Sequence, residues 1–336
     1  MASLVIYSHN LRSPLSISSV IRSHHPSTPR FLLPHSIAVS SRTRNLGSTV
    51  RMANSSSTHQ TQDIVVQQQR IVIQNDHGEK LVGVLHETGS LELVVLCHGF
   101  RSSKENNTML NIAAALEKER ISAFRFDFAG NGESEGSFQY GNYWREADDL
   151  RSVIKHFSGA KRVITAILGH SKGGNVVLLY ASRYPDVHTV INVSGRFNLE
   201  RGIEGRLGKD FLQRIKKDGF IDVKDKTGKA EYRVTEESLL DRLNADMAVA
   251  CHLIEKECRV LTVHGSQDEI VPAEDALEFA KIIRNHKIHI IEGADHGYTS
   301  HQAELISVVL DFTRAGLQQD KDIRNQVEVA NAPADN

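Results

Sequence analysis

Cysteine is scarce in this sequence, with three residues in 336, Cys97, Cys251 and Cys258, and no CxxC spacing. An odd number without paired spacing argues against a disulfide framework and a zinc site, so we expect small buried thiols. The histidine patterns of metal sites are also missing, because none of the 17 His forms an HxxxH or HExxH motif. His286 and His289 start an expected strand three positions apart, which directs them to opposite faces. The sequence therefore predicts no metal and no other cofactor.

Acidic residues and lysine are absent from the first 62 residues, which contain six Arg and 15 Ser. The apolar runs there, 4–7 and 31–33, are too short for a signal-peptide core or a membrane span. This composition is typical of an organelle transit peptide, although a tail without an address is an alternative. We predict a transit peptide over 1–52, a disordered linker over 53–68 and location in the chloroplast stroma, with the mitochondrion as the second choice.

The rest of the chain has no excess of positive charge. Without the six N-terminal Arg, 34 basic residues stand against 41 acidic ones, a formal charge near −7. This balance argues against nucleic acid or an anionic membrane as a partner, and no segment suggests integral membrane association. About 284 residues remain after a cut near Arg51-Met52, the size of one large α/β domain. The oligomeric state does not follow from the sequence.

Short apolar runs alternate with helical patterns from residue 69 onward. A turn signal at 75–78 joins two strands into an expected antiparallel hairpin, 70–76 and 79–86. Further strands are expected at 91–98, 121–128, 162–170, 188–195, 259–265 and 287–293, and helices at 107–120, 141–157, 172–184, 273–283 and 303–315. This alternation predicts an α/β fold with a mostly parallel central sheet and helices on both faces, over residues 69–317. A polar C-terminal tail over 318–336 should be frayed.

Residues 196–257 interrupt the alternation with a charge-rich segment. It contains a possible strand pair, FIDVKD and AEYRVT, and then a helix from about Thr235. We therefore expect an inserted lid subdomain at 196–257.

A serine between glycines follows one of the buried strands, in the motif Gly169-His170-Ser171-Lys172-Gly173. The motif ends a strand and opens a helix, which is the context of a nucleophile elbow. Such a turn strains the serine backbone and leaves no room for side chains at the neighbouring glycines. We predict that Ser171 is a nucleophile; a glycine-rich turn that only packs helix on sheet is the alternative.

A serine nucleophile needs a base, and the base needs an acid that orients it. Asp268 and His296 lie just beyond the C-terminal ends of the two last strands, where an order of Ser, Asp and His along the chain requires them. The rivals are Glu269 and Asp275 for the acid, and His264 and His301 for the base. Each chosen residue also has an alternative interpretation, Asp268 as a turn residue and His296 as a polar loop residue.

An oxyanion needs backbone donors, which we assign to the N–H groups of Phe100 and Lys172. His98 we expect to be a structural hydrogen-bonding residue. The Lys172 side chain either reaches the pocket or is solvated at the first helical turn. Tyr140, Tyr143 and Trp144 either line an acyl pocket or pack against the fold.

Five segments, CHGF, FDFAGNGESEG, GHSKGG, HGSQDEIVP and GADHGY, resemble the α/β-hydrolase superfamily over residues 70–316. Within it they are most similar to plant, plastid-targeted serine esterases of the cinnamoyl (feruloyl) esterase and dienelactone-hydrolase-like branch. The resemblance implies a serine carboxylesterase with a Ser171–His296–Asp268 triad and an acyl-serine intermediate. It also implies that 127–134 is a structural turn and that 196–257 caps the active site. Lysine at 172 departs from the glutamine usual in the bacterial cinnamoyl esterases.

The resemblance leaves the substrate open. The charged character of 196–257 favours a small or medium-sized soluble ester over an aggregated lipid. A lipase or acylglycerol hydrolase, an acyltransferase and a slow-turnover ligand receptor remain alternatives on the same scaffold.

Overall fold

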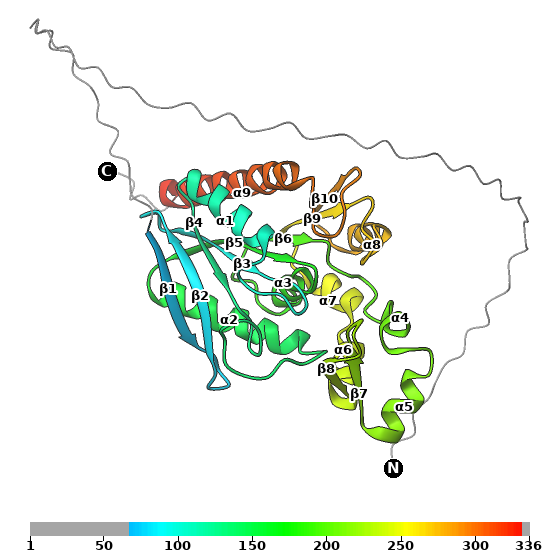
Figure 1. The fold of residues 1–336 in the computed structure, drawn as a ribbon. Helices are drawn as coiled ribbons and strands as arrows, with labels where there is room; N and C mark the ends of the chain where they lie inside the picture. The colour runs from blue at the N-terminus through cyan, green and yellow to red at the C-terminus, as the bar shows by residue number, and fades with distance from the viewer. Residues whose placement is uncertain (1–66, 331–336) are drawn as a thin grey trace, which may run out of the picture. The chain divides into compact units, whose positions relative to one another are not determined.

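The structure is a computed structural model that describes residues 67–330 (Figure 1). The predicted transit peptide and most of the predicted linker lie outside these residues. Residues 67 and 68, assigned to the linker from the sequence, instead belong to the first strand, which runs from Gln67 to Gln74.

An eight-stranded sheet forms the centre of the described domain. Its strands are β1 (Gln67–Gln74), β2 (Lys80–Glu87), β3 (Glu92–Cys97), β4 (Ser122–Phe126), β5 (Val163–His170), β6 (Thr189–Val193), β9 (Arg259–Gly265) and β10 (His286–Ile291). They lie in the order β1-β2-β4-β3-β5-β6-β9-β10. The hairpin of β1 and β2 is antiparallel, as predicted, and β2 pairs antiparallel with β4. All other pairs are parallel, so the C-terminal ends of β3, β5, β9 and β10 meet at one edge.

The helices cover both faces of this sheet (Figure 1). They are α1 (Asn107–Lys118), α2 (Tyr143–Gly159), α3 (Lys172–Arg183), α8 (Glu274–Ile282) and α9 (Gln302–Ala330). The short helix α7 (Met247–Leu253) packs with them. Side chains of α1 and α9 form one apolar cluster with the sheet, and those of α2, α3, α7 and α8 form the other. The predicted α/β class, a mostly parallel sheet between helices, is confirmed.

Strand β3 shows how the sequence produces these two layers. All residues from Leu93 to Cys97 are fully buried. Successive side chains of a strand point to opposite faces. Accordingly, Leu93, Val95 and Cys97 join one cluster, whereas Val94 and Leu96 join the other. A continuous apolar run is therefore what a central parallel strand requires.

The last helix is longer than the sequence suggested. We expected the helix to end near residue 315 and a frayed tail from 318, but α9 continues to Ala330. No proline interrupts it, and Asp320 ties it to the sheet through a 2.7 Å ion pair with Arg259. Gly316 faces Thr189, where a Cβ would approach the Thr189 hydroxyl to 2.7 Å, so this position needs a small residue for close packing.

The segment between β6 and β9 forms its own small layer. It contains α4 (Ile203–Leu207), α5 (Phe211–Asp218), the antiparallel pair β7 (Phe220–Lys224) and β8 (Ala230–Thr235), and α6 (Glu236–Asn244), whereas α7, which follows, packs in the main core. The strand pair and α6 agree with the sequence analysis, while α4, α5 and α7, of five to eight residues, are too short for a periodic pattern. Its apolar core consists of Tyr140, Ile203, Leu207, Ile215, Ile221, Val234 and Leu239. Whether it acts as a lid stays a prediction.

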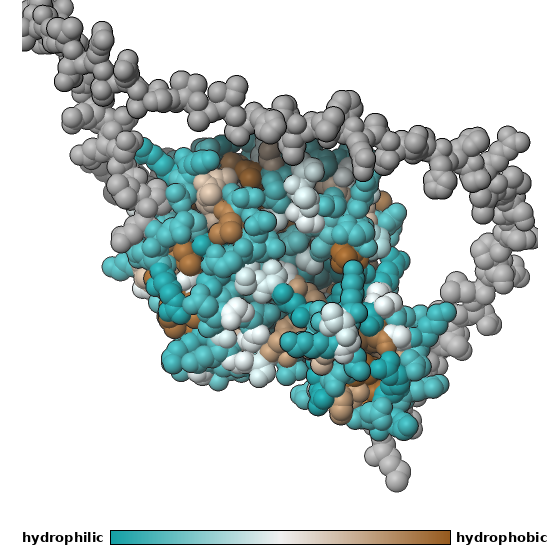
Figure 2. All heavy atoms as spheres, viewed as in Figure 1, coloured by the Kyte–Doolittle hydropathy of each residue, from teal (hydrophilic) through white to brown (hydrophobic). Residues whose placement is uncertain are grey.

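The surface in Figure 2 is mostly hydrophilic, with separate apolar patches rather than one continuous face. Among residues 67–330, no helix combines the length and apolar character needed to cross a bilayer. All three cysteines are buried free thiols, as predicted.

Candidate active site

Ser171 lies on a strained turn between β5 and α3. Its backbone has φ 56° and ψ −120°, values that a residue with a side chain rarely adopts. The Ser171 N–H donates to the carbonyl of Val193 on β6 at 2.7 Å, which holds the turn in place. A Cβ at Gly169 would come within 2.0 Å of the Gly173 carbonyl oxygen, and one at Gly173 within 2.4 Å of the Cys97 carbonyl oxygen. Both glycines are therefore required by close backbone contact.

Three side chains from the C-terminal edge of the sheet form a hydrogen-bonded series. The Ser171 Oγ lies 3.0 Å from His296 Nε2, and His296 Nδ1 lies 2.7 Å from Asp268 Oδ2. Ser171 follows β5, Asp268 follows β9 and His296 follows β10, so parallel strands bring residues 125 positions apart into contact. A neutral His296 with its proton on Nδ1 can accept the serine proton on Nε2.

The side chain of Asp268 is fully buried, and four nitrogen atoms surround its carboxylate. Its Oδ1 accepts the N–H groups of Ile270 and Val271 at 2.9 and 2.7 Å. Its Oδ2 lies 3.3 Å from His264 Nε2, besides the contact with His296. Burial alone would raise the pKa of Asp268, but the hydrogen bonds from His264 and His296 hold it well below its usual range. Asp268 is thus an anion that can stabilise a protonated His296.

A further histidine supports the loop that carries His296. His170, which precedes the serine, donates from Nε2 to the backbone carbonyl of His296 at 2.8 Å. Burial, together with the neighbouring His296, lowers the pKa of His170 to about 4. It is therefore a neutral donor at physiological pH. Neither His170 nor His264 was assigned this role from the sequence, which carries no local signal for it.

The rival residues make other contacts. Glu269 accepts the backbone N–H of His296 at 3.3 Å rather than its ring. Asp275 is buried on α8, where it accepts the Phe197 N–H at 2.8 Å and pairs with Arg201 at 3.1 Å. The His301 N–H donates to the Tyr298 carbonyl at 2.9 Å, at the start of α9.

The loop after β3 passes directly over Ser171. A Cβ at Gly99 would lie 3.1 Å from the Ser171 Cβ, which brings the following Phe100 beside the nucleophile candidate. His98 Nδ1 donates to the Gly99 carbonyl at 2.8 Å, and its Nε2 accepts the Phe128 N–H at 3.1 Å. Burial lowers the pKa of His98 to about 4. His98 is the structural hydrogen-bonding residue expected from the sequence.

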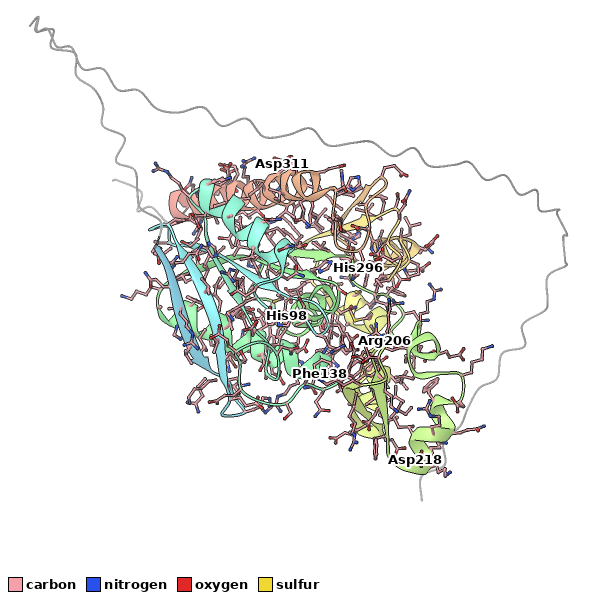
Figure 3. All side chains as sticks on the ribbon, viewed as in Figure 1. His98, Phe138, Arg206, Asp218, His296 and Asp311 are labelled. Carbon is pink, nitrogen blue, oxygen red and sulfur yellow. The ribbon has the colours of Figure 1, made fainter. Side chains whose placement is uncertain are left out.

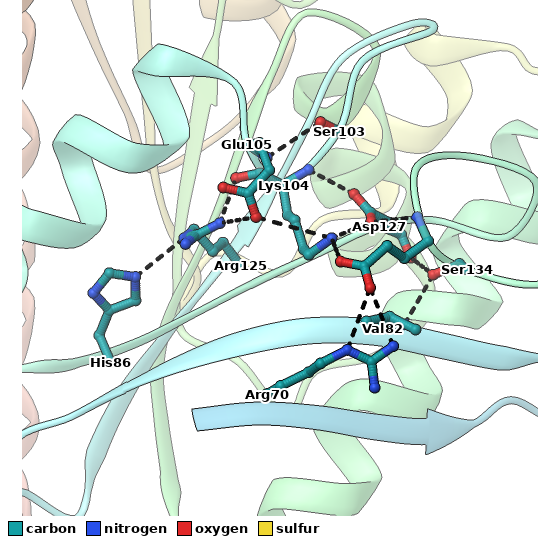
Figure 4. Close-up of polar contacts among 10 residues, drawn as sticks. Arg70, Val82, His86, Ser103, Lys104, Glu105, Arg125, Asp127 and Ser134 are labelled. Carbon is teal, nitrogen blue, oxygen red and sulfur yellow. Dashed lines mark hydrogen bonds and ion pairs between the residues drawn. The ribbon is translucent and has the colours of Figure 1, made fainter. Parts of the chain in front are cut away.

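A buried charge network anchors the far side of the same loop (Figure 4). Asp127 accepts the backbone N–H of Lys104 at 2.6 Å and its Nζ at 2.7 Å. Lys104 Nζ also contacts Glu133 at 2.7 Å. Ser134 Oγ donates to the Asp127 carbonyl at 2.6 Å and accepts the Val82 N–H at 2.9 Å. Residues 127–134 therefore form a structural turn that fixes the loop carrying Phe100.

Comparisons with known proteins find chains of similar fold. The profile of the family described as serine aminopeptidase, S33, matches residues 90–256. Among solved structures, Est1E from Butyrivibrio proteoclasticus with ferulic acid bound superposes with a TM-score of 0.65 at 24% identity, covering 74% of this chain and 99% of Est1E. The α/β hydrolase GrgF from Penicillium sp. sh18 superposes with a TM-score of 0.65 at 18% identity, covering 75% and 99%.

The chain has the α/β-hydrolase fold.

Sequence relatives of this chain are distant. The Saccharomyces cerevisiae protein YDL057W is 26% identical over 230 residues, 62% of this chain and 69% of the yeast protein. Protein phosphatase methylesterase 1 of Candida albicans is 28% identical over 144 residues, 39% of this chain and 39% of the relative. The alignment thus spans well under half the length of the methylesterase.

Lys172 is not the solvated lysine that the sequence allowed. Its side chain is 3% exposed and its Nζ lies 2.6 Å from Glu146 Oε1 on α2, a residue that is itself 7% exposed. The ammonium also lies 5.0 Å from the centre of the Tyr143 ring. Burial raises the pKa of Glu146 to about 7, against the effect of Lys172. Lys172 therefore takes part in a buried ion pair directly behind the nucleophile candidate.

The cavity beside Ser171 is small, about 70 Å³. Tyr140 and Tyr143 line it with Phe100, so these two tyrosines both pack and border the site. Trp144 does not line it and instead packs under the Arg183 guanidinium at 4.1 Å. A larger cleft of about 850 Å³ between the 129–145 region and α6 contains none of the three residues of the series. We place the site at the smaller cavity because it contains Ser171.

Proposed function

We propose that this α/β-hydrolase is a serine carboxylesterase that cleaves small or medium-sized soluble esters. The observation that carries the proposal is the hydrogen-bonded series of Ser171, His296 and Asp268 on a strained turn. A serine held at positive φ with its hydroxyl on an imidazole, and that imidazole on a buried carboxylate, has the arrangement of an activated nucleophile.

The proposed reaction proceeds in two halves. Ser171 Oγ attacks the ester carbonyl while His296 Nε2 takes its proton, and Asp268 stabilises the resulting imidazolium. His296 then returns the proton to the leaving alcohol, which leaves an acyl-serine. A water molecule, deprotonated by His296, attacks the acyl-serine; the bond to Ser171 Oγ breaks, the acid is released and His296 returns the proton to Ser171 Oγ. No step requires a metal or an organic cofactor.

We assign the stabilisation of the tetrahedral oxyanion to the backbone N–H groups of Phe100 and Lys172, which would donate hydrogen bonds to it. Lys172 is the first residue of α3, so its N–H is one of the helix donors without an intrahelical acceptor. Gly99 brings Phe100 to the other side of the serine. Because Lys104 and Asp127 anchor this loop, the Phe100 donor would need no rearrangement during reaction.

The matching family is described as a serine aminopeptidase, but an ester fits this site better than the N-terminal residue of a peptide. An aminopeptidase must bind the free ammonium group of its substrate, which calls for a nearby carboxylate. Within the described part of the chain, no Asp or Glu lines the cavity beside Ser171. The cavity is lined by cations instead, most of them from 196–257, which supports our proposal that this segment caps the active site.

Covalent labelling tests the proposed function. The full chain and its Ser171→Ala variant are treated with a fluorophosphonate probe and assayed on p-nitrophenyl and methyl hydroxycinnamate esters. We expect the variant to lose labelling and nearly all turnover with an unchanged fold. The matched control is Ser182→Ala on the same helix, whose hydroxyl only donates to the Leu179 carbonyl at 2.7 Å and whose loss should change neither readout. Labelling or turnover that survives in Ser171→Ala would refute the assignment.

We also propose import into the chloroplast stroma, on the composition of residues 1–52. A fusion of these residues to a fluorescent protein, expressed in leaf cells, tests this. A mitochondrial signal would select the second choice, and a diffuse cytosolic signal would refute both.

A further inference from the structure

The cavity beside Ser171 carries an unusual concentration of positive charge. Besides Lys172, four arginines line it: Arg196, Arg201, Arg206 and Arg242. All four come from the segment between β6 and β9. Arg196 and Arg201 lie in the loop after β6, Arg206 lies on α4 and Arg242 lies on α6. The chain outside its N-terminal 62 residues is acidic overall, so this cluster does not reflect a generally basic surface.

Two of the five cations are neutralised by carboxylates. Lys172 pairs with Glu146 at 2.6 Å, and Arg201 pairs with Asp275 at 3.1 Å. Across residues 67–330, no carboxylate lies within ion-pair distance of Arg196, Arg206 or Arg242. The cavity therefore keeps three guanidinium groups without an anionic partner.

Hydrogen bonds hold the guanidinium groups of Arg242 and Arg196 in place, whereas Arg206 is exposed and contacts the ring of Phe100. Arg242 is 7% exposed and donates to the Leu199 carbonyl at 2.9 Å and to the Tyr143 hydroxyl at 2.8 Å. Arg196 donates to the carbonyl of Ile270. The Arg206 guanidinium carbon lies 4.8 Å from the centre of the Phe100 ring. Phe100 is the residue whose backbone N–H we assign as a donor to the oxyanion.

Figure 3 shows where Arg206 lies in the fold. In that view Arg206 is labelled below His296 and to the upper right of Phe138, and the Phe100 ring contacts Phe138 with a centroid distance of 5.3 Å. The same Phe100 ring thus joins Arg206 to the nucleophile candidate. The four arginines line the same cavity as Ser171.

Keeping these charges together is costly without a counter-ion. Burial and the neighbouring Arg242 lower the pKa of Arg196. Arg242 is buried and Arg196 is half-buried, and charges in such places are ordinarily paired because an opposite charge offsets the cost of desolvation. Guanidinium forks match the geometry of carboxylate and phosphate oxygens. An anionic group on the ligand would supply the partner that the chain itself does not.

We propose that the substrate is an anionic ester, which carries a carboxylate or phosphate group close to its scissile carbonyl and places that group among Arg196, Arg206 and Arg242. This inference rests on the proposed esterase function and specifies its substrate class. The cavity of about 70 Å³ suits a compact anionic group rather than a long acyl chain.

Three matched esters test the proposal by kinetics: ethyl butyrate, monoethyl succinate and 2-(butyryloxy)ethyl phosphate. We expect kcat/KM for at least one anionic ester to exceed that for ethyl butyrate by about tenfold or more, and the advantage to shrink with added salt. The preferred ester distinguishes a carboxylate on the acyl side from a phosphate on the alcohol side. Equal or lower kcat/KM for both anionic esters would overturn the proposal.

Charge variants separate recognition from general structural effects. Arg206→Gln and Arg196→Gln should each reduce the anionic-to-neutral ratio of kcat/KM about tenfold. The control is Lys217→Gln, an exposed cation on α5 of the same segment that does not line the cavity. It should keep the ratio of the wild type. Equal losses on charged and neutral esters in the arginine variants would contradict a role in anion recognition.

Binding to the Ser171→Ala chain tests the same inference without turnover. By calorimetry, monoethyl succinate should bind at least tenfold more tightly than the neutral diethyl succinate, and Arg206→Gln should remove the difference. If no ester is hydrolysed yet the charged ester binds selectively, the esterase function fails while the anion site stands. Equal affinity for the two ligands would overturn the anion site whatever the catalytic result.

Discussion

The buried pair of Lys172 and Glu146 permits a quantitative test of what holds the turn behind Ser171. Its charged atoms lie 2.6 Å apart, and the side chains are 3% and 7% exposed. At an effective dielectric constant of about 20, two unit charges at this distance attract by about 6 kcal/mol. Desolvation of both groups offsets much of this attraction. Removing one partner nevertheless leaves an uncompensated buried charge, which typically costs about 3 to 5 kcal/mol.

Lys172→Met and Glu146→Gln should therefore each lower the free energy of unfolding by about 3 to 5 kcal/mol at pH 8, measured by urea denaturation of the full chain. The double variant Lys172→Met with Glu146→Gln should lose far less than the sum of the two single losses, because it leaves no buried charge behind. Additive losses in the double variant, or single losses below about 1 kcal/mol, would refute the view that the pair is buried and coupled.

The pH dependence of the Lys172→Met variant gives a second check. Burial raises the pKa of Glu146 to about 7, and without Lys172 it should rise further. An acid with a raised pKa in the folded state binds a proton on folding, so its favourable contribution is lost as the pH rises. The penalty of Lys172→Met should thus be smaller at pH 6 than at pH 8. A penalty that grows toward pH 6 would contradict this account.

Asp268→Asn should reduce kcat on the order of 10⁴-fold with an unchanged circular dichroism spectrum, because the amide no longer stabilises the imidazolium; near-normal kcat would refute its role. Gly173→Ala should give insoluble or strongly destabilised protein, since its Cβ would lie 2.4 Å from a backbone oxygen. Gly159→Ala, with no atom within 4 Å, is the control and should be neutral or stabilising by up to about 1 kcal/mol in thermal unfolding. Burial lowers the pKa of three histidines to about 4: His98, His170 and His286. Because the unfolded chain binds these protons first, the free energy of unfolding should fall between pH 6.5 and 4 by up to about 1.4 kcal/mol per pH unit and histidine, and a urea series without this slope would contradict their burial as neutral groups.

Local patterns accounted for most of the fold because each one reports a constraint within a few residues. The apolar run of β3 is continuous because both faces of the sheet are covered. The glycines around Ser171 follow from a turn in which the backbone leaves no room for a Cβ. The same patterns failed at α4, α5 and α7, which are shorter than the period needed to recognise a helix.

The members of the hydrogen-bonded series could be named from the sequence, because parallel strands end at a common edge. Any residue just beyond such an end lies near the others that share the edge, so the positions of Ser171, Asp268 and His296 were constrained by strand order alone. The support from His170 and His264 could not be named in this way. It depends on the path of two loops and on which ring atom faces which oxygen.

What the sequence by itself determined is the alternation of strands and helices, the strained serine turn and the order of the three residues along the chain. These depend on periodicity and backbone sterics, which act locally. The tertiary structure decided the environment of Lys172, since only packing of α2 against α3 brings Glu146 to its ammonium. It also decided the charge of the cavity, where Arg196, Arg206 and Arg242 converge from three separate elements. Charge acts through space, so its sum at a site is fixed only when the elements that carry it are folded together.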